Sequence, residues 1–197
     1  KMKSGRNGLL VHPTGAGKSL IIADIAARLE EPLIVFQPNK EILEQNFAKL
    51  QTYGIWDCSI YSASVGRKEI SRITFATIGS VIRHMKDFQH FKNILIDECH
   101  LVKPSDGMYK RFFEQAERRI VGLTATPYRL YSCMNGSMLK FLTRTRPRVF
   151  SQVLYYCQVS ELLAKGFLSR LKYYDVTRID LTKVRRNSSG ADFDDAS

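Results

Sequence analysis

The sequence has no apolar run approaching the roughly 18–20 residues that a membrane-spanning helix requires, so we expect no membrane protein. Lysines stand near the first residue, but no apolar stretch follows them, and we expect no signal peptide. Cysteine is also scarce. The four cysteines form no CxxC pair, and no histidine lies at zinc-finger spacing from them. This pattern disfavours a zinc site and a disulfide framework, and it fits a reducing, cytoplasmic compartment.

Acidic residues are few compared with basic ones. The chain has 30 Lys and Arg residues against 19 Asp and Glu residues, which gives a formal net charge of +11. Such an excess attracts polyanions, nucleic acid first and anionic membranes or acidic proteins second, although a merely soluble basic domain has the same balance. With 197 residues, of which 44% are apolar and 25% charged, the chain can form one domain with its own core.

Short apolar runs alternate with helix-type patterns along most of the chain. The run at 93–97 has almost no polar alternation, which is typical of a strand in the centre of a parallel sheet. The pattern predicts an α/β fold in which helices flank a mostly parallel central sheet. Residues 128–157 show few periodic signals. We expect strands at 8–12, 33–36, 58–61, 73–76, 93–97, 119–123 and 171–176, and helices at about 20–29, 39–50, 77–85, 109–116 and 159–165.

The most specific motif is HPTGAGKS, from His12 to Ser19, which follows an expected strand and precedes an expected helix. Small residues let backbone N–H groups curl around a phosphate, and the helix N-terminus adds the positive end of its dipole. Lys18 would reach the β- and γ-phosphates, and the Ser19 hydroxyl would ligate Mg²⁺. The strict pattern has glycine where this chain has His12, and a chance glycine-rich turn is the alternative. The expected nucleotide-binding residues are Thr14, Gly15, Ala16, Gly17, Lys18 and Ser19.

A second motif, Asp97-Glu98-Cys99-His100, ends the central apolar strand. Two adjacent acids there are costly to bury unless a metal or a partner uses them. We expect Asp97 to hold Mg²⁺ directly or through water, and Glu98 to orient and deprotonate an attacking water. A simple surface turn is the alternative explanation. The phosphate loop about 80 residues upstream favours the functional motif over it.

The third motif is LTATP at 123–127, again at the end of an apolar strand. The hydroxyls of Thr124 and Thr126 are placed to hydrogen-bond Glu98 or His100 and to relay the nucleotide state to a second site. Taken singly, the motif is also explained as a threonine-rich strand end closed by proline. A phosphate-loop kinase or a small-molecule NTPase would lack it.

In this order, the three motifs resemble motifs I, II and III of the superfamily 2 helicases and translocases, in the DExH group. The resemblance implies a RecA-like P-loop NTPase domain that hydrolyses ATP with Mg²⁺ to drive movement along nucleic acid. The stretches at 60–63, 75–81, 122–130 and 161–169 are similar to the RadD-like (YejH-like) branch of bacterial DNA-repair helicases. Restriction-type double-strand translocases, XPB-type helicases and RNA helicases are the alternatives.

The resemblance also implies a division of the chain. We assign 1–180 to the first RecA-like, helicase ATP-binding domain and 181–197 to a linker or loop toward a second RecA-like domain, since no later motif follows. The glutamine motif that reads adenine in this superfamily would lie before residue 1. We therefore expect a part of a longer protein that hydrolyses ATP poorly by itself. The implied partners are single-stranded or branched DNA, the second domain and single-strand-binding protein.

Nucleic-acid contacts are implied at two places by the resemblance. The run at 37–41 stands where motif Ia would lie, and the run at 75–80 stands where a later contacting motif would lie. Backbone amides at helix N-termini and hydroxyl groups suit phosphates and carry no base code. Helix N-caps at Asn39 and Thr77 are the structural alternative, and both explanations can hold together. The residues carried over are Pro38, Asn39, Lys40, Thr77, Ile78 and Gly79.

Most of the surplus charge lies after the third motif. Residues 134–186 contain eleven Lys and Arg residues and three Asp and Glu residues. A charge run is usually a solvated face, and we only slightly favour a surface toward DNA or a second domain. Tyrosines among these bases could stack on unpaired bases, although tyrosines in strands are more often half-buried packing residues. They are Tyr155, Tyr156, Tyr173 and Tyr174.

Overall fold

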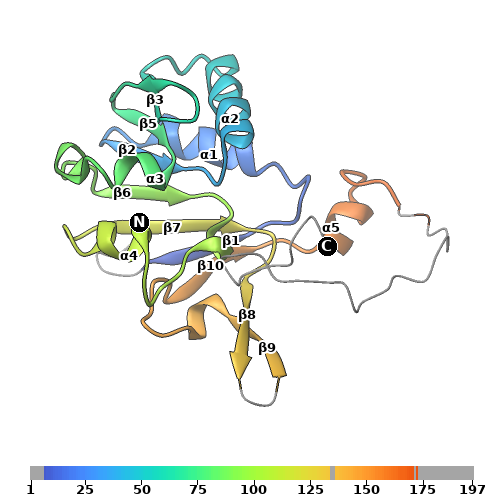
Figure 1. Cartoon of the computed structure of the whole chain (residues 1–197). Coiled ribbons are helices and arrows are strands. Elements are labelled where there is room, and N and C mark those ends of the chain that lie inside the picture. Colours follow the sequence, from blue (N-terminus) through green and yellow to red (C-terminus); the bar gives the residue numbers. More distant parts are fainter. Residues whose placement is uncertain (1–6, 134–135, 171, 173–197) are drawn as a thin grey trace.

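The computed structural model describes residues 7–133, 136–170 and 172, and it is built on one eight-stranded sheet (Figure 1). Seven strands run parallel, and the short strand β4 at one edge is antiparallel to its neighbour. This arrangement confirms the expected α/β class. In order across the sheet, the strands are β10 (Gln152–Tyr156), β1 (Gly8–Val11), β7 (Arg119–Thr124), β6 (Asn93–Ile96), β2 (Leu33–Phe36), β5 (Ile73–Ala76), β3 (Cys58–Ser62) and β4 (Arg67–Lys68).

One face of the sheet is covered by α1 (Lys18–Arg28) and α2 (Lys40–Thr52). In α2 the predicted apolar positions Leu43, Phe47 and Leu50 form one stripe, and all three are buried. Asn39 caps this helix, which confirms the structural alternative given for this residue, because its side chain accepts a hydrogen bond from the backbone of Ile42 at 2.9 Å.

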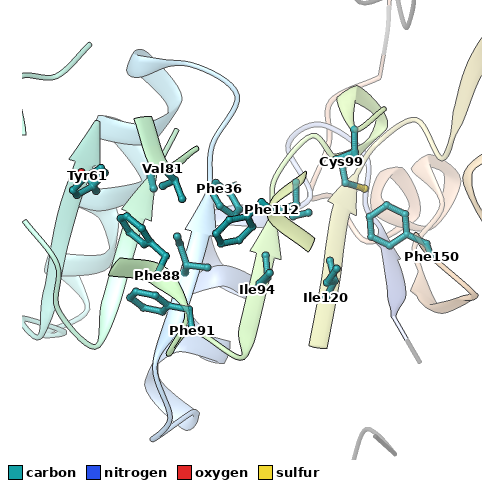
Figure 2. Close-up of a cluster of buried hydrophobic side chains, with 14 of the residues drawn as sticks. Phe36, Tyr61, Val81, Phe88, Phe91, Ile94, Cys99, Phe112, Ile120 and Phe150 are labelled. Carbon is teal, nitrogen blue, oxygen red and sulfur yellow. The ribbon is translucent and has the colours of Figure 1, made fainter. Parts of the chain in front are cut away.

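The opposite face buries a second cluster that is rich in phenylalanine (Figure 2). It lies under α3 (Ile78–Val81), the 3-10 helix η1 (Met85–Phe88) and α4 (Met108–Phe113). The ring of Phe36 meets that of Phe112 edge to face, with centroids 5.3 Å apart. Because alternate side chains of β2 enter opposite faces, both faces of the central strands are buried, which explains their unbroken apolar runs.

Two helices are shorter than the sequence predicts. The helix expected at 77–85 ends at Val81, since the chain turns at His84 and enters η1, where Phe88 reaches the core. The helix expected at 109–116 ends at Phe113, because the chain has to return to the start of β7 at Arg119. In both places a tertiary requirement ends the helix before its local pattern stops.

Two features between 128 and 157 have no counterpart in the prediction. The strand β10 adds a parallel edge next to β1, and its side chains stay largely exposed, with Tyr155 at 54% and Tyr156 at 59%. The strands β8 (Tyr128–Cys133) and β9 (Gly136–Phe141) pair as a separate antiparallel hairpin that projects from the body of the domain (Figure 1). Neither feature has the buried apolar pattern that marks the central strands.

The last described elements are the 3-10 helix η3 (Leu142–Arg144) and α5 (Val159–Ala164), the latter close to the predicted helix at 159–165. Apart from Lys172, the strand expected at 171–176 lies outside the described residues, as do Tyr173, Tyr174 and the segment 181–197. Within the described part of the chain, no helix combines the length and apolar character needed to cross a bilayer.

One glycine in the centre of the sheet is required by close packing. A Cβ atom added at Gly122 of β7 would lie 2.5 Å from Cys99 Sγ and 2.8 Å from the ring of Phe150. Figure 2 shows Cys99 and Phe150 together beside this strand. The 3-10 helix η2 (Cys99–Leu101), which follows β6, can therefore approach β7 only over a residue without a side chain.

We predict that Gly122→Ala lowers the free energy of unfolding by about 1–3 kcal/mol, since the added methyl group overpacks a buried site. Gly79→Ala is the matched control, because a Cβ atom there meets nothing within 4 Å. Urea unfolding of the two variants measures the difference. Equal midpoints for both variants would contradict the packing argument.

Candidate functional site

The three motifs meet at one edge of the sheet. The phosphate loop follows the carboxyl end of β1, Asp97 and Glu98 follow that of β6, and Thr124 is the last residue of β7. Since β7 lies between β1 and β6 and all three run parallel, their ends lie side by side. In α/β sheets this edge is where ligands bind.

The phosphate loop has the backbone of an anion-binding turn. Gly15 and Gly17 both have φ of +81°, a left-handed conformation that glycine adopts without steric cost. The turn around Thr14 and Ala16 is closed by the Ala16 amide, which donates to the Pro13 carbonyl at 3.1 Å. Helix α1 then begins at Lys18 with Gly17 as its N-cap, so its free N–H groups point toward the loop.

Lys18 and Glu98 form an ion pair although 80 residues separate them in the chain. Glu98 also lies 3.3 Å from Nδ1 of His100. Burial raises the pKa of Glu98, but the hydrogen bonds and charges of His100 and Lys18 outweigh that effect and hold it below its usual value. The carboxylate is therefore ionised at neutral pH and is able to accept a proton.

The backbone at Glu98 is strained. Its φ of +46° and ψ of +49° are left-handed, and among the described residues other than glycine it alone has a positive φ. For a residue with a Cβ atom this conformation costs about 1–2 kcal/mol. The Glu98 amide donates to Asp97 Oδ1 at 3.0 Å, which helps to hold the turn. Strain of this kind is common at functional sites.

A residue that the sequence did not single out connects the motifs. Asn46 of α2 accepts a hydrogen bond from the Ser19 hydroxyl at 2.6 Å and donates to Asp97 Oδ2 at 3.3 Å. It also donates to Gln37 Oε1 at 3.2 Å. The available signal was a single amide within the apolar stripe of α2, beside Phe47, where a buried polar side chain needs partners.

Asp97 and Gln37 are almost fully enclosed, with 5% and 1% of their surfaces exposed. Burial raises the pKa of Asp97, and the nearby charge of Lys18 opposes that shift. Nε2 of Gln37 is buried without a hydrogen-bond partner among the described residues. The site thus contains an unsatisfied donor next to a desolvated carboxylate, and both are groups that a polar ligand would satisfy.

The third motif contacts the second through one histidine. Thr124 Oγ1 lies 3.0 Å from Nδ1 of His100. The Thr126 amide donates to Thr124 Oγ1 at 3.0 Å, and the Thr124 hydroxyl donates to the Thr126 carbonyl at 3.1 Å. The structure therefore links Glu98 to the end of β7 through His100, and Thr126 takes part through its backbone.

A cavity of about 420 Å³, here called the central groove, lies beside this site. Its lining brings Pro38 and Thr77, which follow β2 and β5, together with Asp97 and Glu98. Ile78 and Gly79 also line it, whereas Asn39 and Lys40 are exposed outside the lining. Thr77 is held by its hydroxyl, 3.1 Å from that of Ser62 and 3.0 Å from that of Ser80.

His12, which replaces the usual first glycine of the loop, is buried and stacks on Tyr155 of β10 with ring centroids 5.3 Å apart. Burial and the charge of Lys18 lower the pKa of His12, so the ring is neutral at pH 7. The Leu168 side chain also lies close to the loop, since it would be 3.0 Å from a Cβ atom added at Gly15. Residues after the third motif thus form part of the surroundings of the phosphate loop.

The donor set fits ATP with Mg²⁺. The Ser19 hydroxyl and the Asp97 carboxylate are hard oxygen ligands of the kind that Mg²⁺ prefers, and Asn46 holds both within one hydrogen-bonded group. The left-handed Gly15 and Gly17 and the start of α1 form a cradle for phosphate. In this structure the Lys18 ammonium already holds one anion, the Glu98 carboxylate.

We predict that Asn46→Ala lowers the free energy of unfolding by about 1–3 kcal/mol, because buried groups of Ser19, Gln37 and Asp97 lose their shared partner. The neighbouring Gln45→Ala changes an exposed side chain of the same helix and should shift stability by less than about 0.5 kcal/mol. Chemical denaturation of both variants checks this. A loss of similar size for Gln45→Ala would contradict this explanation, since alanine favours the helix at both positions.

Comparison with known proteins finds relatives that are named as a helicase and a translocase. A putative ATP-dependent RNA helicase of Acanthamoeba polyphaga mimivirus is 29% identical over 134 residues, which are 64% of this chain and 26% of that protein. The DNA 3'-5' translocase XPB2 of Sulfurisphaera tokodaii is 28% identical over 127 residues, 63% of this chain and 28% of that protein. The chain spans about a quarter of the length of these curated relatives.

Two solved structures share the fold. The UvsW helicase from bacteriophage T4 aligns with a TM-score of 0.54 and 20% identity, over 62% of this chain and 48% of that one. The Type ISP restriction-modification enzyme LlaGI, a nuclease-deletion mutant in complex with a DNA substrate mimic, aligns with a TM-score of 0.59 and 13% identity, over 83% of this chain and 19% of that one. At these identities the likeness shows the fold alone.

A match to a protein-family model shows which family this chain belongs to. The model described as "Type III restriction enzyme, res subunit" matches residues 2–129, well over half of the chain. The matched range includes the phosphate loop, Asp97 and Glu98, and the threonine motif. This chain therefore belongs to the ResIII family and carries the first RecA-like, helicase-type ATPase domain of superfamily 2.

Proposed function

We propose that this chain is the ATP-hydrolysing motor domain of a helicase or translocase that moves along nucleic acid. One observation carries the proposal. The central groove is lined both by Asp97 and Glu98 of the candidate ATP site and by Pro38 and Thr77 of the candidate nucleic-acid site. A phosphate-loop enzyme that acts on small molecules has no need of such a shared wall.

The phosphate loop and its surroundings would bind the nucleotide. Thr14 to Gly17 would offer backbone amides to the phosphates, and Lys18 would exchange its ion pair with Glu98 for the β- and γ-phosphate oxygens. Ser19 and Asp97 would hold Mg²⁺, whose charge stabilises the charge of the transferring phosphoryl group. Asn46 would fix the positions of these two ligands relative to each other, because it contacts both.

Glu98 would act as the general base. Its ion pair with Lys18 and its contact with His100 keep it ionised, so it can accept a proton from a water that attacks the terminal phosphate. When Lys18 moves to a bound phosphate, the Glu98 carboxylate oxygen that it held becomes free to contact that water. The reaction is then phosphoryl transfer to water, and positioning and charge supply most of the catalysis.

His100, Thr124 and Thr126 would couple hydrolysis to movement. The hydrogen bond between His100 and Thr124 joins the turn that contains Glu98 to the end of β7. A change at Glu98 on nucleotide binding would therefore reach the residues after β7 through one contact. Pro38, Thr77, Ile78 and Gly79 would hold the sugar–phosphate backbone at the other wall of the groove. Asn39 and Lys40, which are exposed outside the lining, would contact the same backbone beyond it.

Within this class we propose a cytoplasmic DNA-repair motor of the RadD-like branch, which acts on single-stranded or branched DNA and meets single-strand-binding protein. The similarity of the segments at 60–63, 75–81, 122–130 and 161–169 supports this assignment. Residues 1–180 would be the first RecA-like domain, and 181–197 would lead to a second one that completes the ATP site. The isolated chain would then hydrolyse ATP poorly.

We predict that Lys18→Ala and Glu98→Gln in the full-length protein each reduce ATP turnover by about 100-fold or more, since each removes a group that acts on the reacting phosphate or water. Nucleic-acid affinity should remain close to that of the unchanged protein. A phosphate-release assay and a nucleic-acid binding titration separate the two effects. Turnover retained in both variants would refute the assignment.

We also predict that single-stranded DNA raises the ATPase rate of the full-length protein more than duplex DNA or RNA does. Duplex DNA as the strongest activator would favour a restriction-type double-strand translocase. RNA as the strongest would favour an RNA helicase, the activity in the name of the viral relative. A rate that no nucleic acid changes would exclude a motor.

A further inference from the structure

The hairpin of β8 and β9 has a basic face. Residues paired across an antiparallel ladder share a face, so Arg129 and Lys140 lie together, and Tyr131 and Met138 follow on the same side. The ammonium of Lys140 lies 4.9 Å from the centre of the Tyr131 ring. The opposite face presents Leu139 and other apolar side chains.

The base of this hairpin is fixed to the candidate ATPase site. The Arg129 guanidinium is buried and donates to the backbone carbonyl of Val102, directly after η2. The Leu142 amide closes the hairpin by donating to the Pro127 carbonyl at 2.8 Å. Val102 stands four residues after Glu98, so the hairpin is attached to the turn that contains the candidate general base.

A second cavity of about 330 Å³, here called the hairpin pocket, lies between the hairpin, the loop around Lys103 and the segment at Arg146. Its lining has four basic side chains and one carboxylate, that of Asp106. In the described part of the chain, no carboxylate lies within ion-pair distance of Lys103, Lys140 or Arg146. Among the described residues, no ion pair therefore neutralises these three charges.

The hairpin pocket continues the central groove. Lys103 and Asp106 line both cavities, so the two cavities meet at this loop. A polymer held at Pro38 and Thr77 would therefore reach Lys103 and then the hairpin without leaving the surface. A strand of nucleic acid has the required form, since its phosphates repeat along a flexible chain and attract basic side chains.

We infer that the hairpin pocket is a second binding site for the phosphate backbone of the nucleic acid, with Lys103, Lys140 and Arg146 as its contacting side chains. This inference rests on the proposed function, because it extends the path of the strand beyond the central groove. Arg129 serves as the anchor that ties this contact to the turn after β6. The contact carries no base readout, since it is made to phosphates.

The test is the salt dependence of nucleic-acid binding by the intact protein with Lys140→Ala and Arg146→Ala combined. Loss of two phosphate contacts should reduce the slope of log affinity against log salt by about 1.4 for single-stranded DNA or RNA and about 1.8 for duplex DNA. Anisotropy of labelled oligonucleotides of each kind gives the slopes. The charge-preserving pair Lys140→Arg and Arg146→Lys should keep the original slope.

The matched control is Lys49→Ala with Lys92→Ala, which removes two exposed charges outside the linings of both cavities. The inference is overturned if the hairpin variant keeps the slope of the unchanged protein, or if the control loses as much. It is also overturned if the hairpin variant loses binding to poly-glutamate but not to nucleic acid, which would indicate an acidic protein partner. Failure of the proposed function has a different result: the unchanged protein would bind no nucleic acid.

Discussion

Two adjacent carboxylates end a strand that is buried on both faces, and the rest of the site depends on how their charges are compensated. Asp97 is 5% exposed, and Glu98 sits in a left-handed turn. Such charges are unfavourable unless cations and donors surround them. Lys18 provides the cation and Asn46 the donor, so the compensation links the start of α1 and the middle of α2 to the end of β6.

The same compensation gives the site its capacity to change. A bound phosphate would compete with Glu98 for Lys18. A bound Mg²⁺ would compete with Asn46 for Ser19 and Asp97. On the other side, the turn after β6 supports both His100 and the anchor of the hairpin at Val102. One turn thus stands between the proposed nucleotide site, the third motif and the proposed path of the nucleic acid.

The strands that could be predicted are those buried on both faces, because burial imposes an unbroken apolar run within the segment itself. Residues 33–36 and 73–76 match β2 and β5 to the residue. The edge strand β10 and the hairpin escaped prediction because their exposed side chains carry no such pattern. Helix ends such as Val81 were misplaced because the burial of Phe88, and not local propensity, decides them.

By itself the sequence determined the α/β class and the phosphate-binding and carboxylate motifs, because each lies within a few consecutive residues whose spacing states its chemistry. Only the tertiary structure decided that Asn46 joins Ser19 to Asp97 and that Leu168 lies against the phosphate loop. It also decided that Arg129 of the hairpin donates to the Val102 carbonyl. These contacts depend on the order of strands in the sheet, which puts β7 between β1 and β6. Strand order is set by the packing of the whole domain, so no local pattern contains it.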